Sequence, residues 1–205
     1  MNNSFAEILT KIISDSTQKS GNSFVLIGGQ ARSGKSTIAK KISDGLKNTG
    51  ITSTIICLDH WIVDGDKRDA SFTVRERYDY DGIIESIHIL LNEAQLLLNH
   101  YNPKSKAHTI EQFEYLLSKD DVLIIEGVPA LDIKALRELS STSIFIKIDE
   151  TTRKQRFMEY YKSYGFSQSY ILSLYKQRCL DEIEIIEKTS LLADFHLYVN
   201  KIIAL

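Results

Sequence analysis

A run of residues near the N-terminus, Gly29 to Thr37, has the composition of a phosphate-binding site. Gly29-Gln30-Ala31-Arg32-Ser33-Gly34-Lys35-Ser36 fits the pattern G-x-x-x-x-G-K-[ST] in full. The glycines allow a tight turn in which successive N–H groups point at phosphate oxygens. Lys35 would reach the β- and γ-phosphates, and the Ser36 hydroxyl would bind Mg²⁺. Arg32 either covers a phosphate or points to solvent, and Thr37 either joins the site or packs locally.

Two carboxylates follow buried apolar runs and are candidates for further chemistry. Glu126 comes directly after Val122-Leu123-Ile124-Ile125, where an acidic group can hold Mg²⁺ directly or through water. Asp59 follows Leu58, where a carboxylate can accept a proton from an attacking hydroxyl. Each has a structural alternative, because Glu126 could cap Gly127 or the following helix and Asp59 could cap its loop.

The residues after Asp59 are candidates for the acceptor pocket. His60 and Trp61 place an aromatic ring beside a polar group, a combination that suits a ring-shaped substrate. The alternative for His60 is a loop histidine with its hydrogen bonds satisfied. We therefore expect the acceptor on the side of the sheet that Asp59 faces.

The elements that must position these groups alternate along the chain. Short apolar runs predict strands at 24–27, 54–58, 122–125, 144–148 and 195–199. Helical spacing is found at 4–18, 35–47, 81–99, 132–139, 150–163 and 168–188. Residues 60–80 and 101–108 indicate loops, and 109–118 a short helix or strand. This order predicts an α/β fold with a five-stranded parallel sheet covered by helices on both faces.

Composition excludes several classes of protein. A chain of 205 residues with 43% hydrophobic and 25% charged residues fits one globular domain over 1–205. The net charge of −2 provides no overall basic field, so no nucleic-acid partner is expected. No apolar run approaches the ~18 residues of a membrane span, and the N-terminus lacks the pattern of a signal peptide. Cys57 and Cys179 indicate reduced thiols in a cytoplasmic protein, and no metal site beyond Mg²⁺ is expected.

Together these segments resemble the uridine kinase and phosphoribulokinase family of P-loop kinases, over about residues 23–200. The resemblance lies in the phosphate loop, in Leu58-Asp59-His60-Trp61, in Ile125-Glu126-Gly127-Val128-Pro129-Ala130-Leu131, in the strand and arginine-bearing helix of 148–156, and in Ala193-Asp194. It implies a P-loop NTPase fold with a helical lid at about 150–165 and an acceptor-binding region at about 60–120. It also implies that Asp59 is the general base.

The same resemblance assigns Arg153 and Arg156 to the nucleotide phosphates. Their spacing of three residues places both on one helix face, for which a solvated basic face is the alternative. Arg178 in the next helix either returns toward the site or pairs with Asp181 or Glu182. The nearby tyrosines at 160, 161 and 164 indicate helix packing.

The acceptor side matches the family less closely. Tyr78-Asp79-Tyr80-Asp81-Gly82-Ile83 is similar to a segment whose Asp binds substrate hydroxyls, so Asp79 and Asp81 are both candidates, with helix capping as the alternative. Tyr101 and His108 lie where the family carries Tyr-Asp-Phe-x-x-His-Ser-Arg, which is not preserved, and Ile62 stands in place of a tyrosine. These departures leave ATP use intact and put uridine in doubt.

The sequence thus predicts an ATP- and Mg²⁺-dependent kinase that acts on a hydroxyl of a small molecule, namely a nucleoside, sugar or polyol. The alternatives are a nucleotide kinase with a phosphorylated acceptor, a 5′-end kinase of nucleic acid, which the net charge disfavours, and a GTP- or ATP-binding switch. The switch would need Asn-Lys-x-Asp, and Asn200-Lys201-Ile202 is followed by Ile203 instead of Asp. The apolar face of the helix within residues 1–20 docks on its own sheet or on a second subunit, which would make a homo-oligomer.

Overall fold

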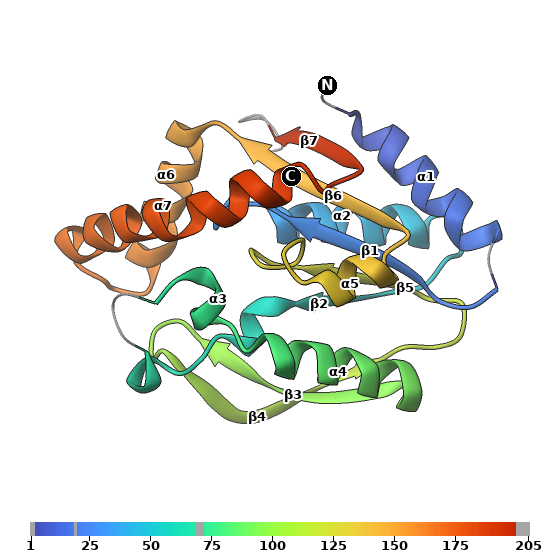
Figure 1. Ribbon diagram of the computed structural model, residues 1–205, viewed down its shortest axis with the longest axis horizontal. Coiled ribbons are helices and arrows are strands. Elements are labelled where there is room, and N and C mark those ends of the chain that lie inside the picture. The colour runs from blue at the N-terminus through green and yellow to red at the C-terminus, as the bar shows by residue number, and fades with distance from the viewer. Residues whose placement is uncertain (1–2, 19, 69–71, 200–205) are drawn as a thin grey trace.

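The central element is a five-stranded parallel sheet of strand order β2-β5-β1-β6-β7 (Figure 1). In the computed structural model, residues 3–18, 20–68 and 72–199 are described. The strands are β1 (Ser23–Gly28), β2 (Ser53–Cys57), β5 (Val122–Glu126), β6 (Thr142–Ile148) and β7 (Phe195–Val199). All of their pairings are parallel, which confirms the predicted sheet.

Helices cover both faces of this sheet. They are α1 (Phe5–Gln18), α2 (Lys35–Lys47), α3 (Val74–Arg77), α4 (Tyr80–Glu93), α5 (Lys134–Leu139), α6 (Glu150–Ser163) and α7 (Gln168–Ser190). Alternate residues of the strands supply two cores. Val25 and Ile124 pack with α1 and α2, whereas Leu26 and Leu123 pack with α4, α5 and the end of α7. This alternation is what a strand buried on both faces requires.

The N-terminal helix docks on its own domain. Ile8 and Ile12 are buried in the core under α1 and α2. A Cβ added to Gly45 of α2 would lie 2.7 Å from Leu9, so α1 and α2 approach closely at that point. Of the two predictions for the apolar face of this helix, the structure shows the intramolecular one.

A β-hairpin is the main departure from the predicted elements. The expected helix over 81–99 ends at Glu93, and residues 95–102 form β3 (Gln95–Asn102), which pairs antiparallel with β4 (Ala107–Leu116). Ala94 adopts a left-handed φ of 59°, which ends the helix. The hairpin confines the expected loop at 101–108 to the turn at 103–106, and residues 109–116 are strand. It lies with α4 at the bottom of Figure 1.

The described residues of the segment 60–80, namely 60–68 and 72–80, are more ordered than their lack of periodicity predicted. It begins within the 3₁₀ turn η1 (Leu58–Trp61), continues through a second 3₁₀ turn, η2 (Gly65–Lys67), and then forms α3. An antiparallel bridge between Ile62 and Tyr78 closes the segment on itself. These contacts hold the segment beside the carboxyl end of β2.

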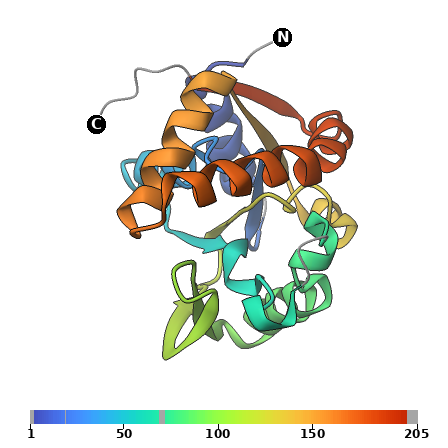
Figure 2. The same ribbon diagram turned by 90° about the vertical axis from the view of Figure 1, so that its left-hand side faces the viewer.

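Helices α6 and α7 lie side by side across one end of the sheet (Figure 2). A separate apolar cluster joins them through Phe157, Ile171 and Tyr175. The interpretation of residues 150–165 as a lid stays a prediction.

None of the described helices is long and apolar enough to cross a membrane. The segment Asn200-Lys201-Ile202, which bears on the switch alternative, lies outside the described residues.

Candidate functional site

The carboxyl ends of three adjacent strands bring the predicted groups to one edge of the sheet. Glu126 at the end of β5 is in register with Ile27 of β1 and with Cys57 of β2. The phosphate loop therefore follows β1 on one side of Glu126, and Asp59 follows β2 on the other. Ligands bind at this edge in open parallel sheets.

The phosphate loop has the backbone that its glycines predict. Gly29 and Gly34 have φ of 140° and 104°, which is left-handed space that glycine adopts without strain. No side chain caps α2, whose N-cap is Gly34, so the first N–H groups of this helix point at the site. Lys35 is buried, and its Nζ donates to the Gln30 carbonyl at 3.0 Å. These groups form an anion cradle.

Ser36 and Glu126 meet beside this cradle. The Ser36 hydroxyl donates to Glu126 Oε1 at 2.7 Å. Burial, followed by the charges of Asp59 and Glu126, raises the pKa of the Cys57 thiol, which shows that the two carboxylates create a negative field there. A hydroxyl and a carboxylate in a negative field fit Mg²⁺, which uses few protein oxygens and keeps waters and phosphate oxygens as its other ligands.

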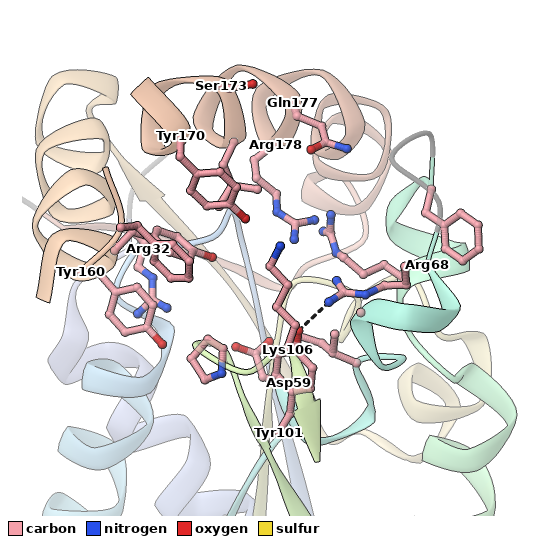
Figure 3. A pocket seen from close by; sticks show the side chains of 18 residues that line it. Arg32, Asp59, Arg68, Tyr101, Lys106, Tyr160, Tyr170, Ser173, Gln177 and Arg178 are labelled. Carbon is pink, nitrogen blue, oxygen red and sulfur yellow. Dashed lines mark hydrogen bonds between the residues drawn. The ribbon is translucent and has the colours of Figure 1, made fainter. Parts of the chain in front are cut away.

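Two cavities meet at Asp59. The first, of about 570 Å³, is lined by the phosphate loop, Ser36, Thr37 and Glu126. The second, of about 400 Å³, lies between the hairpin, η2 and α7 and is lined by Tyr101, Lys106 and Tyr170 among others (Figure 3). The residues that line both are Arg32, Asp59, Ile62, Arg77, Tyr160, Tyr161 and Arg178. We call the first the phosphate cavity and the second the outer cavity.

The carboxylate at this junction is held by a tyrosine. The Tyr78 hydroxyl donates to Asp59 Oδ1 at 2.9 Å. Tyr78 is itself buried, and burial with the nearby Asp59 charge raises the pKa of its hydroxyl. The hydroxyl therefore stays protonated and orients the carboxylate between the two cavities.

The three predicted arginines have different surroundings. A Cβ added to Gly34 would lie 3.2 Å from Arg156 Nη1, so this guanidinium covers the phosphate loop and lines the phosphate cavity. Arg32, with a φ of 66°, stacks on the Tyr160 ring at 3.1 Å and lines both cavities. Arg153 is fully buried and pairs with Glu150, 2.7 Å from its Nε, so the structure does not bring it into either cavity.

Two buried charges hold the phosphate loop from outside. Glu182 Oε2 of α7 accepts from the Ala31 N–H at 3.0 Å, and Arg153 Nη1 of α6 donates to the Ala31 carbonyl at 3.4 Å. Glu182 also lies 3.6 Å from Arg77, which pairs with Asp181 as well. Burial raises the pKa of Glu182. Both peptide groups of this loop residue are thus tied to helices far along the chain.

His60 and Trp61 face away from the cavities, contrary to the expectation that they line the acceptor pocket. Trp61 is buried in the core, and its indole N–H donates to Ser86 of α4 at 3.2 Å. His60 stacks on His100 of the hairpin with ring centroids 4.0 Å apart. Burial, with His100, lowers the pKa of His60 to about 4. The 3₁₀ turn after β2 explains this, because it directs Asp59 to the cavities and its neighbours to the opposite side.

Of the other predicted acceptor residues, one lines the outer cavity and three do not. Tyr101 lines the outer cavity. His108 does not, because its ring bridges Asp64 at 2.8 Å and the His60 carbonyl at 2.7 Å. Asp79 caps α4 by accepting from the Gly82 N–H at 2.9 Å, and Asp81 is exposed in the first turn of the helix. Neither aspartate is among the residues that line the two cavities.

Sequence reasoning missed much of the outer cavity. Its lining includes Arg68, Lys106, Tyr170 and, shared with the phosphate cavity, Arg77. Arg178 does both of the things considered for it, since it pairs with Asp181 at 3.2 Å and lines both cavities. Tyr160 and Tyr161, interpreted as packing residues, line both cavities too. No motif linked these residues, because they come from separate segments of the chain.

Solved structures with this architecture include proteins that are named kinases. A protein from Silicibacter sp. TM1040, provisionally named fructose transport system kinase, superposes with a TM-score of 0.72 at 15% identity and covers 95% of this chain and 99% of its own. D-glycerate 3-kinase from Cryptococcus neoformans var. grubii gives 0.64 at 12% identity, covering 96% and 95%. At such identities the likeness shows the fold, which is that of a P-loop kinase.

Comparison of sequences finds relatives that are named uridine kinase. A uridine kinase from Halalkalibacterium halodurans is 30% identical over 138 residues, which is 64% of each chain. One from Halobacterium salinarum is 27% identical over 145 residues, covering 65% of this chain and 60% of the relative. The chain thus matches just under two thirds of the length of these relatives. No model of a known protein family matches it. The resemblance to uridine kinases that the motifs indicated is confirmed.

Proposed function

We propose that this protein is an ATP- and Mg²⁺-dependent kinase that transfers the γ-phosphoryl group to a hydroxyl of a small molecule. The observation that carries the proposal is the position of Asp59, which lines both the phosphate cavity and the outer cavity. A carboxylate between a phosphate cradle and a second cavity is where a phosphoryl-transfer base must lie. The similarity to proteins named uridine kinase supports it.

In this proposal the transfer is a single displacement. The acceptor hydroxyl gives its proton to Asp59 as its oxygen bonds to the γ-phosphorus, and the bond from that phosphorus to the β–γ bridging oxygen breaks, leaving ADP. Lys35, the α2 N-terminus and Arg156 stabilise the charge on the phosphoryl oxygens. Ser36 and Glu126 would hold Mg²⁺, which would supply positive charge against the developing negative charge of the phosphates.

The test is ADP formation from ATP and Mg²⁺ against nucleosides, nucleotides, sugars, polyols and the phosphate and carboxylate derivatives of the sugars and polyols, with a blank that lacks an acceptor. A large increase with one class of acceptor is the expected result. Thermal shift with ATP serves as the control for nucleotide binding. ATP binding with no acceptor-dependent ADP in the whole panel would contradict the kinase proposal, and a preference for GTP would favour a nucleotide switch.

A further inference from the structure

The lining of the outer cavity has a strong excess of positive charge. Among the residues that the structure describes, its basic residues are Arg32, Arg68, Arg77, Lys106 and Arg178, and its one carboxylate is Asp59. In Figure 3 the side chains of Arg68, Lys106 and Arg178 extend toward the same space, with Asp59 at its lower edge. Like charges that converge in a partly enclosed space raise the free energy of the empty site and favour an anion within it.

Some of these charges are already balanced. Arg77 pairs with Asp181 and lies 3.6 Å from Glu182, and Arg178 shares Asp181 at 3.2 Å. Arg32 stacks on an aromatic ring and reaches the phosphate cavity, where nucleotide phosphates would face it. The positive charges left over are therefore concentrated at the other end of the outer cavity.

Arg68 and Lys106 form that end, and each of them contacts a tyrosine. The Arg68 guanidinium donates to the Tyr101 hydroxyl at 2.5 Å, while its Nε is buried without a hydrogen-bond partner. Lys106 Nζ lies 5.2 Å from the centre of the Tyr170 ring. Within the described part of the chain, no carboxylate forms an ion pair with either residue. A buried N–H without a partner indicates a ligand acceptor atom.

We propose that the acceptor carries an oxyanion, a phosphate monoester or a carboxylate, that binds between Arg68 and Lys106 while its reacting hydroxyl lies at Asp59. The proposal deepens the kinase function and rests on it. The volume of the outer cavity, about 400 Å³, fits an acceptor in which several bonds separate the oxyanion from the reacting hydroxyl. An oxyanion would accept from the guanidinium N–H groups and the ammonium at once, and such charge-assisted hydrogen bonds are the stronger kind.

The experiment uses two sets of matched acceptors, each on one carbon skeleton. The first set is glucose, glucose 6-phosphate and gluconate, and the second is glycerol, glycerol 3-phosphate and glycerate. The expected result is a kcat/KM at least ~10-fold higher for an anionic member than for its neutral counterpart. The phosphate and carboxylate arms identify which oxyanion is bound. If a neutral member is the best acceptor, the kinase function stands and the oxyanion site is overturned.

Two variants test the assignment of residues. Lys106→Gln and Arg68→Gln should each raise the KM of the anionic acceptor ~10- to 100-fold, with kcat changed only a few-fold and the KM of ATP unchanged. Lys104→Gln is the matched control, because Lys104 is an exposed lysine in the same hairpin turn and does not line the cavity. Equal KM values in Lys106→Gln and Lys104→Gln would overturn the proposal. Lys106 is exposed, so its variant remains informative if Arg68→Gln fails to fold.

A binding measurement separates this proposal from the failure of the kinase function. With the phosphate cavity saturated by ADP and Mg²⁺, glycerol 3-phosphate and glycerate are titrated calorimetrically into the wild-type protein and both lysine variants. Binding that Lys106→Gln weakens and Lys104→Gln leaves intact supports the oxyanion site even if no acceptor is phosphorylated. No binding, or equal binding to all three proteins, overturns it.

Discussion

The phosphate cavity and the outer cavity share Asp59 but are built in different ways. The phosphate cavity is built around the consecutive residues that follow β1, whose backbone N–H groups form the anion cradle, and side chains from other elements complete its lining. The outer cavity is formed by side chains from η2, the hairpin, α6 and α7. A backbone site is fixed by a short motif, whereas a side-chain site exists only after distant segments pack.

This difference assigns separate tasks to the two cavities. A cradle of backbone groups binds phosphates of any nucleotide with similar geometry. A cavity lined by arginines, a lysine and tyrosines can change its ligand by exchanging a few side chains, without altering the sheet. Variants of residues in each cavity test whether the two cavities contribute separately.

The largest effect is expected at the phosphate cavity. Lys35→Ala removes the buried ammonium from the cradle, so ADP formation should fall by at least ~100-fold, and the thermal shift with ATP should shrink. Lys41, on α2 but outside both cavities, provides the control Lys41→Ala. Wild-type turnover in Lys35→Ala would contradict the assignment of the phosphate loop.

Asp59→Asn tests the junction of the cavities. The amide keeps the shape and can accept from Tyr78 but cannot take a proton at neutral pH, so kcat should fall by ~10²- to 10⁴-fold. ATP affinity, measured by thermal shift or calorimetry, should change little. A normal kcat would remove Asp59 as the base, and a loss of ATP affinity alone would place it in the phosphate cavity only.

Glu182→Ala tests the attachment of the phosphate loop to α7. It leaves the Ala31 N–H without its acceptor and removes a partner of Arg77, at a cost of about 2 to 4 kcal/mol and a decrease in Tm of roughly 5 to 10 °C. Glu184, which is exposed on the same helix and pairs with Lys188, gives the control Glu184→Ala. Similar Tm values for the two variants would contradict this prediction.

The smallest effect concerns the anchoring of η1 on the hairpin. The pKa of His60 is lowered from 6.5 to about 4, so between these values the unfolded chain binds more protons than the folded one. Stability is therefore full above pH 6.5 and decreases as pH falls toward 4, by on the order of 2 to 3 kcal/mol.

His60→Phe keeps an aromatic ring against His100 and cannot become charged. Its Tm should depend less on pH between 7 and 4.5 than that of the wild type, whereas the exposed His88→Gln should keep the wild-type slope. An unchanged slope in His60→Phe would show that another group titrates in this range.

Much of the fold could be predicted because the sheet is buried on both faces. Continuous apolar runs such as Val122-Leu123-Ile124-Ile125 leave few alternatives to a central strand. The hairpin could not be predicted in the same way. Leu98 fits the helical spacing of α4, whereas the helix ends at Glu93 because the next residue, Ala94, adopts a left-handed conformation that sequence spacing does not reveal. Residues 95–102 form a strand because they pair with β4.

The candidate site also contains residues that local sequence predicts and residues that depend on tertiary packing. Lys35, Ser36 and Glu126 follow from local sequence at strand ends, and the structure brings them together. Asp79 was open to two interpretations, and its cap on Gly82 is a local contact that the sequence alone did not favour. Lys106 had no motif at all, because its contact with Tyr170 depends on how the hairpin meets α7.

Helix α7 has a mechanical consequence for both cavities. Its 23 residues form a rod about 34 Å long. Tyr170 near one end lines the outer cavity, Glu182 in the middle holds Ala31 of the phosphate loop, and the Ser190 carbonyl at the other end meets His196 of β7 at 2.6 Å. Because α7 is one continuous helix attached to β7, a tilt that moves Tyr170 in the outer cavity also displaces Glu182. An acceptor bound in the outer cavity is therefore coupled through α7 to the phosphate loop.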